Sequence, residues 1–259
     1  MQRFVIRTLQ AMTIVACLLL ASSATRLGAQ SKTPPARLGV SRQLIVVTTP
    51  SWNATSGELR RFVRTNVRAP WRSVGGRVPI VVGRTGLAWG DSALATVSAE
   101  PIKHEGDGRA PAGVFPLDTA FGFGTRAEMP WVHLPYASLQ PGSDCVDDTS
   151  SSHYNTVVDR GAVQKADWNS AEHMRSVNQY RLGVIVGYNA APPRRGRGSC
   201  IFLHIWSGPS SSTAGCTAME ASELEAIMRW LDSSRRPTIV QLPAASYQRL
   251  RGAWQLPAV

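Results

Sequence analysis

A histidine and a cysteine twelve positions apart could carry nucleophilic chemistry in this chain. His204 stands in the apolar segment CIFLHIW (200–206), and Cys216 follows a loop of small residues. A cysteine attacks as its thiolate, and a neighbouring imidazole favours that form by taking the thiol proton. The same spacing is also compatible with a small buried cysteine and a hydrogen-bonded core histidine, so the residues alone leave both interpretations open.

The residues just before Cys216 suit a site that stabilises a developing negative charge. Gly215 has no side chain to obstruct a substrate, and the backbone N–H groups of Gly215 and Cys216 could donate to the oxyanion of a tetrahedral intermediate. Thr213 is expected to order this loop. Cys216 is therefore the candidate nucleophile, with His204 as its base.

The cysteines also bear on the compartment. Cys145, Cys200 and Cys216 lie beyond the first thirty residues, and none belongs to a C-x-x-C pair. A zinc site is therefore not expected, and no other metal-ligand pattern or cofactor motif is found. In an oxidising compartment two of the three thiols should pair and one should remain free.

The N-terminus has the pattern of a secretory signal. Arg3 and Arg7 precede an apolar run (9–21) and small residues, which predicts a signal peptide over 1–29, cleaved after Ala24 or Ala29. The run is too short for a transmembrane span, so no span is expected after cleavage. The segment ending at Cys17 also resembles a lipoprotein signal, although its most apolar part follows that cysteine. The predicted location is the periplasm or cell envelope.

Composition narrows the class of protein and of partner. Hydrophobic residues make up 43% of the chain and charged residues 17%, a balance typical of a globular protein. The net charge of +11 suits an anionic surrounding such as peptidoglycan. No aromatic-basic platform or helix-turn-helix pattern is present, so no nucleic-acid partner is expected. The protein is predicted to be a monomer.

Hydrophobic patterning predicts a strand-rich α+β domain over 43–259, preceded by a short tether at 30–42. Strands are predicted at 43–50, 78–84, 181–188, 200–206 and 237–242, with a turn between two strands around 95–116. Helices are predicted at 54–69, near 170–181 and from Ser222 onward, the last with a capping box of Ser222 and Glu225. Because strands outnumber helices and do not alternate with them regularly, a β-rich α+β fold is favoured.

The motif around the cysteine resembles a known family. His204, Thr213, Gly215, Cys216 and Met219 are similar to the active-site motif of the YkuD-type L,D-transpeptidases, and the segment 108–118 (GRAPAGVFPLD) resembles the upstream hairpin of that family. The resemblance implies a mixed β-sandwich with a helix after the catalytic cysteine. It also implies that a backbone carbonyl, not an aspartate, orients His204.

The implied reaction is transpeptidation of peptidoglycan stem peptides. In the family the cysteine attacks the carbonyl of the third stem residue, the terminal D-alanine leaves, and a thioester forms. An amine of a second stem then resolves the thioester as a 3→3 crosslink. If Cys216 is this nucleophile, Cys145 and Cys200 are left to pair, so the resemblance implies a disulfide between them.

Two departures from the family motif leave the acceptor open. Ala214 replaces the family histidine two places before the cysteine, and Ala218 replaces an arginine that helps to hold the substrate. Another cation must then bind a stem-peptide carboxylate, and the candidates are Arg109, Arg194, Arg195 and Arg197. One alternative is hydrolysis by an L,D-carboxypeptidase or amidase that uses the same Cys-His pair. The other alternative is a non-catalytic domain that binds the cell wall.

Overall fold

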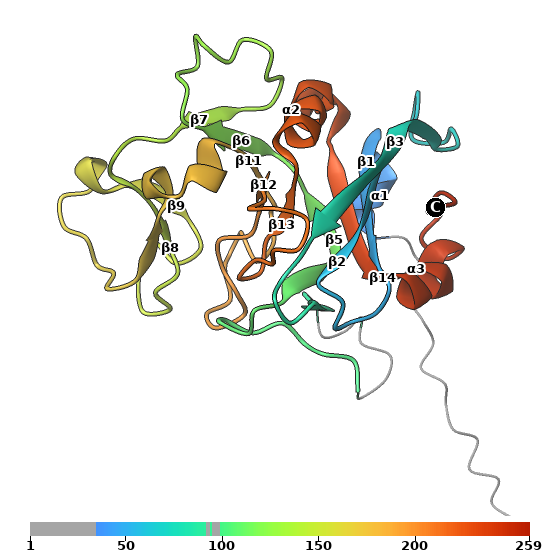
Figure 1. Cartoon of the computed structure of the whole chain (residues 1–259), viewed down its shortest axis with the longest axis horizontal. Helices are drawn as coiled ribbons and strands as arrows, with labels where there is room; N and C mark the ends of the chain where they lie inside the picture. Colours follow the sequence, from blue (N-terminus) through green and yellow to red (C-terminus); the bar gives the residue numbers. More distant parts are fainter. Residues whose placement is uncertain (1–34, 92–93, 95–98) are drawn as a thin grey trace, which may run out of the picture.

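The computed structural model describes residues 35–91, 94 and 99–259 (Figure 1). The predicted signal peptide, the first part of the predicted tether and Cys17 lie outside the described residues. Within the remainder of the tether, a short helix α1 forms over Ala36–Val40 and packs against β5.

An eleven-stranded sheet forms the body of the protein, in the order β4-β5-β14-β1-β2-β3-β13-β12-β11-β6-β7. Its strands are β1 (Gln43–Thr49), β2 (Ser56–Val63), β3 (Arg72–Val81), β4 (Leu87–Trp89), β5 (Ala110–Pro116), β6 (Thr119–Gly122), β7 (Tyr136–Ser138), β11 (Leu182–Ile185), β12 (Phe202–Ile205), β13 (Thr217–Met219) and β14 (Thr238–Pro243). Parallel and antiparallel pairs are mixed, since β1 runs parallel to β14 but antiparallel to β2.

A second, three-stranded sheet has the order β10-β8-β9 and lies on the left in Figure 1. Its strands are β8 (Ser143–Val146), β9 (Val157–Asp159) and β10 (Ala171–His173). The longer helices are α2 (Ala221–Trp230), which packs against β11 and β12, and α3 (Ala244–Arg251), which packs against β14 and β1. The β-rich α+β class predicted from the sequence is confirmed.

The predicted helix at 54–69 is wrong, because this segment forms strand β2. Its buried side chains, Leu59 and Phe62, are three residues apart, which is the spacing of a helix face. The pairing of β2 with β3 shifts register between Leu59 and Arg61. An irregularity of this kind inserts one extra residue into the alternation of buried and exposed side chains along the strand. Two buried side chains are then three residues apart, as they would be on one face of a helix.

Two further helix predictions need correction. The segment 170–181 holds strand β10 and two short 3₁₀ helices, Met174–Ser176 and Asn178–Arg181, in place of one α-helix. The helix after the cysteine is present as α2, but Ser222 and Glu225 do not form its capping box. The carboxylate of Glu220 instead accepts a hydrogen bond from the Ser222 amide at 2.6 Å and caps the helix.

The buried apolar side chains form two clusters. The larger one fills the space between the main sheet and its helices, and includes Leu44, Trp89 and Ile227. The smaller one contains Phe121, Tyr180 and Phe202 together with all three cysteines of the described chain. None of the helices in the described part of the chain is long and apolar enough to span a bilayer.

Candidate active site

The pairing of β12 with β13 brings the predicted histidine and cysteine to one face of the sheet. These strands are parallel, and His204 lies opposite Ala218. Successive side chains of a strand point to opposite faces, so Cys216, two residues before Ala218, lies on the same face as His204. The two side chains line one cavity of about 160 Å³, together with Thr213 and Ala218.

The loop before Cys216 is held by the hydroxyl and backbone of Thr213. Its Oγ1 donates to the carbonyl of Cys216 at 2.7 Å and accepts from the Gly215 amide at 3.1 Å. Its own amide donates to the Val82 carbonyl at 3.0 Å, and its carbonyl accepts from the Arg84 amide at 2.8 Å. The cysteine loop is thereby joined to the chain just after β3.

These bonds bear on the predicted oxyanion donors. The Gly215 amide is already bound to Thr213, so it would have to leave that hydroxyl before it could donate to a substrate oxygen. Among the hydrogen bonds found in the described chain, none uses the Cys216 amide. The N–H of Cys216 is thus the predicted donor that is not already bound within the loop.

The thiol of Cys216 is buried, and only 5% of the residue is exposed. Its sulfur accepts a hydrogen bond from the Phe202 amide at 3.3 Å and donates to the Cys200 carbonyl at 3.4 Å. Burial raises the pKa of the Cys216 thiol, and the nearby carboxylate of Glu172 raises it further. The thiol is therefore neutral at rest, and its proton must leave as the sulfur attacks.

His204 is oriented by a backbone carbonyl. Its Nδ1 lies 2.8 Å from the carbonyl oxygen of Ile205, which can only accept, so Nδ1 carries the proton and Nε2 keeps the lone pair of the neutral ring. The ring packs edge-on against Tyr180 with centroids 5.2 Å apart. Burial lowers the pKa of His204, and the bond to Ile205 partly opposes that shift. The imidazole is thus a neutral base in the resting site.

The disulfide between Cys145 and Cys200 is confirmed. It joins β8 of the small sheet to the segment just before β12, across a sequence separation of 55 residues. Cys216 is the free cysteine of the described chain. The bridge also places the small sheet beside the thiol, since Cys200 lines a second cavity that reaches Cys216.

This second cavity, of about 140 Å³, is lined by charged side chains. Cys216, Ala214 and Glu172 line both cavities and therefore stand at their junction. The other charged residues of the second cavity are Arg84, Lys103, Glu105 and Asp147. The thiol is therefore flanked on this side by charged side chains of both signs.

None of the four arginines proposed from the sequence as carboxylate partners lines either cavity. Arg109 donates to the carbonyls of Trp52 and Leu87 at 3.1 and 2.8 Å. Arg195 donates to the Thr149 carbonyl. Arg194 and Arg197 line a separate cavity, of about 260 Å³.

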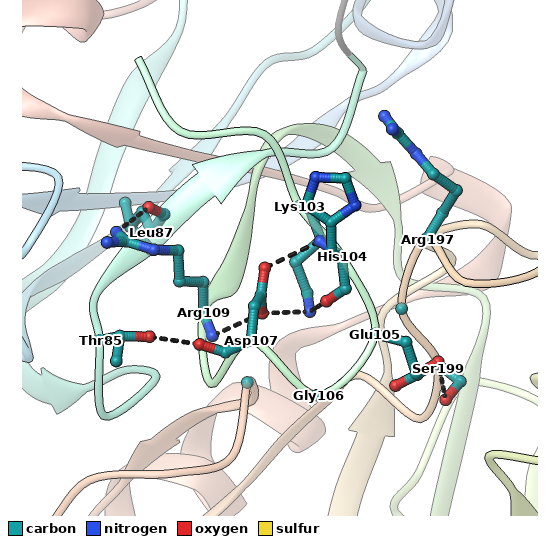
Figure 2. A network of polar contacts seen from close by, with 12 residues as sticks. Thr85, Leu87, Lys103, His104, Glu105, Gly106, Asp107, Arg109, Arg197 and Ser199 are labelled. Carbon is teal, nitrogen blue, oxygen red and sulfur yellow. Dashed lines mark hydrogen bonds and ion pairs between the residues drawn. The ribbon is translucent and has the colours of Figure 1, made fainter. Parts of the chain in front are cut away.

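Arg84 and Lys103 are the cations that do line the second cavity, and neither was predicted as a site residue from the sequence. Figure 2 shows Lys103 within the 103–109 turn, where its Nζ donates to Asp107 at 2.7 Å and to the His104 carbonyl at 2.6 Å. Arg84 is exposed and makes one long contact, 3.4 Å, with the Gly106 carbonyl. The one sequence feature that could have indicated a role for Arg84 is its position at the end of a predicted strand, next to a turn.

Tyr180 and Glu172 were also missed. The Tyr180 hydroxyl donates its proton to Glu172 Oε2 at 2.6 Å, and it lies close to the Cys216 sulfur. Burial raises the pKa of Glu172, while the bond from Tyr180 opposes that shift. One tyrosine thus contacts the thiol, the imidazole and a carboxylate.

The described residues contain no group of three or more His, Cys, Asp or Glu side chains that could hold a metal ion. No model of a known protein family matches this chain, and no curated protein matches it. The geometry around Cys216 is therefore the basis for assigning a function.

Proposed function

We propose that this protein is an exported cysteine acyltransferase that acts as a peptidoglycan L,D-transpeptidase, with a YkuD-like catalytic domain. One observation carries the proposal. The free thiol of Cys216 shares a cavity with His204, whose Nδ1 is fixed by the Ile205 carbonyl so that Nε2 can accept a proton. A neutral imidazole in the same cavity as a neutral thiol is suited to general-base activation of a nucleophile.

The reaction follows from these two groups. The thiol proton, which at rest is donated to the Cys200 carbonyl, first turns toward His204. Nε2 of His204 takes this proton while the Cys216 sulfur attacks the carbonyl of the third stem residue. The Cys216 amide donates to the oxyanion of the tetrahedral intermediate. The imidazolium then protonates the nitrogen of the leaving D-alanine, and a thioester remains. An amine of a second stem attacks the thioester, its proton passes to His204, and the thiol re-forms as the crosslink is released.

Hydrolysis of the same thioester is the second candidate, and the environment of Ala218 favours it. Ala218 is fully buried opposite His204, where the family motif has an arginine. Water in place of the amine would give an L,D-carboxypeptidase or an amidase. Arg84, which lines the second cavity, is the cation best placed to bind a substrate carboxylate in either reaction.

Export to an oxidising compartment agrees with the rest of the chain. The predicted signal peptide and the Cys145–Cys200 disulfide both suit the periplasm or cell envelope. The whole chain has a net charge of +11, and Arg3, Arg7 and Arg26 would leave with the signal peptide, so 11 − 3 = +8 remains. This positive charge suits an anionic wall. Peptidoglycan stem peptides are therefore the proposed partners.

Incubation of the purified protein with disaccharide-tetrapeptides, followed by mass analysis of the products, tests the function. Transfer gives crosslinked dimers and free D-alanine, whereas hydrolysis gives tripeptides and free D-alanine. Cys216→Ala should abolish both products while the far-UV circular dichroism spectrum stays that of the wild type. Unchanged substrate with the folded wild-type protein would favour a non-catalytic wall-binding domain and refute the enzymatic proposal.

A further inference from the structure

Glu172 occupies an unusual place for a carboxylate. It lies on β10 opposite Cys145 of β8, and Cys145 is bonded to Cys200 next to the thiol. The small sheet and its disulfide thereby bring Glu172 to the junction of the two cavities that meet at Cys216. This position is close enough for the Glu172 charge to raise the pKa of the thiol.

The contacts of Glu172 leave half of its carboxylate open. Oε2 accepts a hydrogen bond from Tyr180 at 2.6 Å, and no hydrogen bond to Oε1 is found among the described residues. A partly buried carboxylate with an open oxygen is stabilised by a charged donor. Such a donor would bind between the thiol and the small sheet.

The two described cations that line the second cavity do not fill this role. Lys103 lines the second cavity, but its ammonium is bound to Asp107 and to the His104 carbonyl. Arg84 is exposed, and its guanidinium makes one long hydrogen bond among the described residues, to the Gly106 carbonyl. No ion pair to Glu172 occurs within the described part of the chain.

We infer that Glu172 is a specificity-determining residue whose carboxylate receives an ammonium group that the substrate carries near the carbon attacked by Cys216. The inference rests on the proposed function, because it assumes that Cys216 is the nucleophile. Tyr180 holds the carboxylate in place and leaves Oε1 for the substrate. Peptides with a free amine near the reacting carbonyl are then preferred over peptides in which that amine is acylated.

Three methanethiosulfonate reagents of similar size but different charge test the inference. The aminoethyl reagent is a cation, the methyl reagent is neutral and the sulfonatoethyl reagent is an anion. In each case the sulfur of Cys216 forms a disulfide with the reagent and methanesulfinate leaves. Peptide mapping by mass measures the rate at Cys216 separately from Cys17, and the urea-unfolded protein supplies the intrinsic reactivity of each reagent.

The folded wild type should prefer the cation over the anion by at least about tenfold relative to the unfolded reference. Glu172→Gln should lower this ratio about tenfold, since it removes one partly screened charge beside the reagent. Glu225→Gln is the matched control, because Glu225 lies on α2, pairs with Arg229 and lines neither cavity. Its ratio should equal that of the wild type.

The outcomes separate this inference from the proposed function. The inference is overturned, and the proposed function is not, if Cys216 of the wild type is labelled without a preference for the cation. The same holds if the cation-to-anion ratio is unchanged in Glu172→Gln. If Glu172→Gln does not fold, the wild-type ratio and Glu172→Asp decide the matter. Absence of labelling by all three reagents in the folded protein overturns the proposed nucleophile and the inference together.

Discussion

Replacement of both Cys145 and Cys200 with alanine removes the covalent link between the small sheet and the strand that bears His204. The bridge closes a loop across a sequence separation of 55 residues. In the chain-entropy model, a loop of this length lowers the conformational entropy of the unfolded chain enough to stabilise the fold by about 4 kcal/mol. The free energy of unfolding, measured by urea titration of tryptophan fluorescence, should fall by roughly that amount.

The double substitution is chosen so that no unpaired partner can exchange with the free thiol of Cys216. Cys216→Ala, which leaves the bridge intact, is the matched control and should change the free energy of unfolding far less. The double variant should also lose the preference of Cys216 for cationic reagents. Glu172 lies opposite Cys145 in the small sheet, so the bridge holds this carboxylate near the thiol. A loss of stability below about 1 kcal/mol would refute the claim that the bridge holds the small sheet in place.

Three other perturbations test the packing and protonation of the site. Thr213→Val removes a hydroxyl that bonds the Cys216 carbonyl and the Gly215 amide, and should lower the free energy of unfolding by about 1–2 kcal/mol in a urea titration. Gly183→Ala would place a Cβ 2.2 Å from the Phe121 ring, and should lower the thermal midpoint by several degrees in a calorimetric scan. Because burial lowers the pKa of His204 in the folded state, the unfolded chain binds its proton at higher pH, so stability should fall as pH drops below about 6.5. His204→Gln should reduce that loss between pH 7.5 and pH 5 in urea titrations, and an equal loss in both proteins would contradict the assigned shift.

The strands with continuous apolar runs were predictable, because burial of both faces dictates their composition. Segments 43–50 and 237–242 were predicted as strands and correspond to β1 and β14, which pair in the interior of the sheet. Strand β2 was not predictable from periodicity, since its irregular pairing spaces Leu59 and Phe62 as on a helix. The order of eleven strands likewise depends on contacts between distant segments.

The same distinction applies to the site. His204 on β12 and Cys216, directly before the neighbouring β13, lie close in sequence, so a local motif was enough to select them. Glu172 reaches the thiol through the small sheet and its disulfide, and Arg84 through the end of β3. Tyr180 reaches it because the 3₁₀ helix that carries it packs against β12. No spacing in the sequence marks such residues.

Acylation of Cys216 by a carbapenem tests the central claim most directly. Opening of the β-lactam by the thiol adds the whole mass of the drug and requires the same proton transfer to His204. The account predicts one adduct, mapped to Cys216, that forms at least about 100-fold more slowly in His204→Gln and does not form in Cys216→Ala. An equal rate in His204→Gln, or no adduct with the folded wild type, would contradict it.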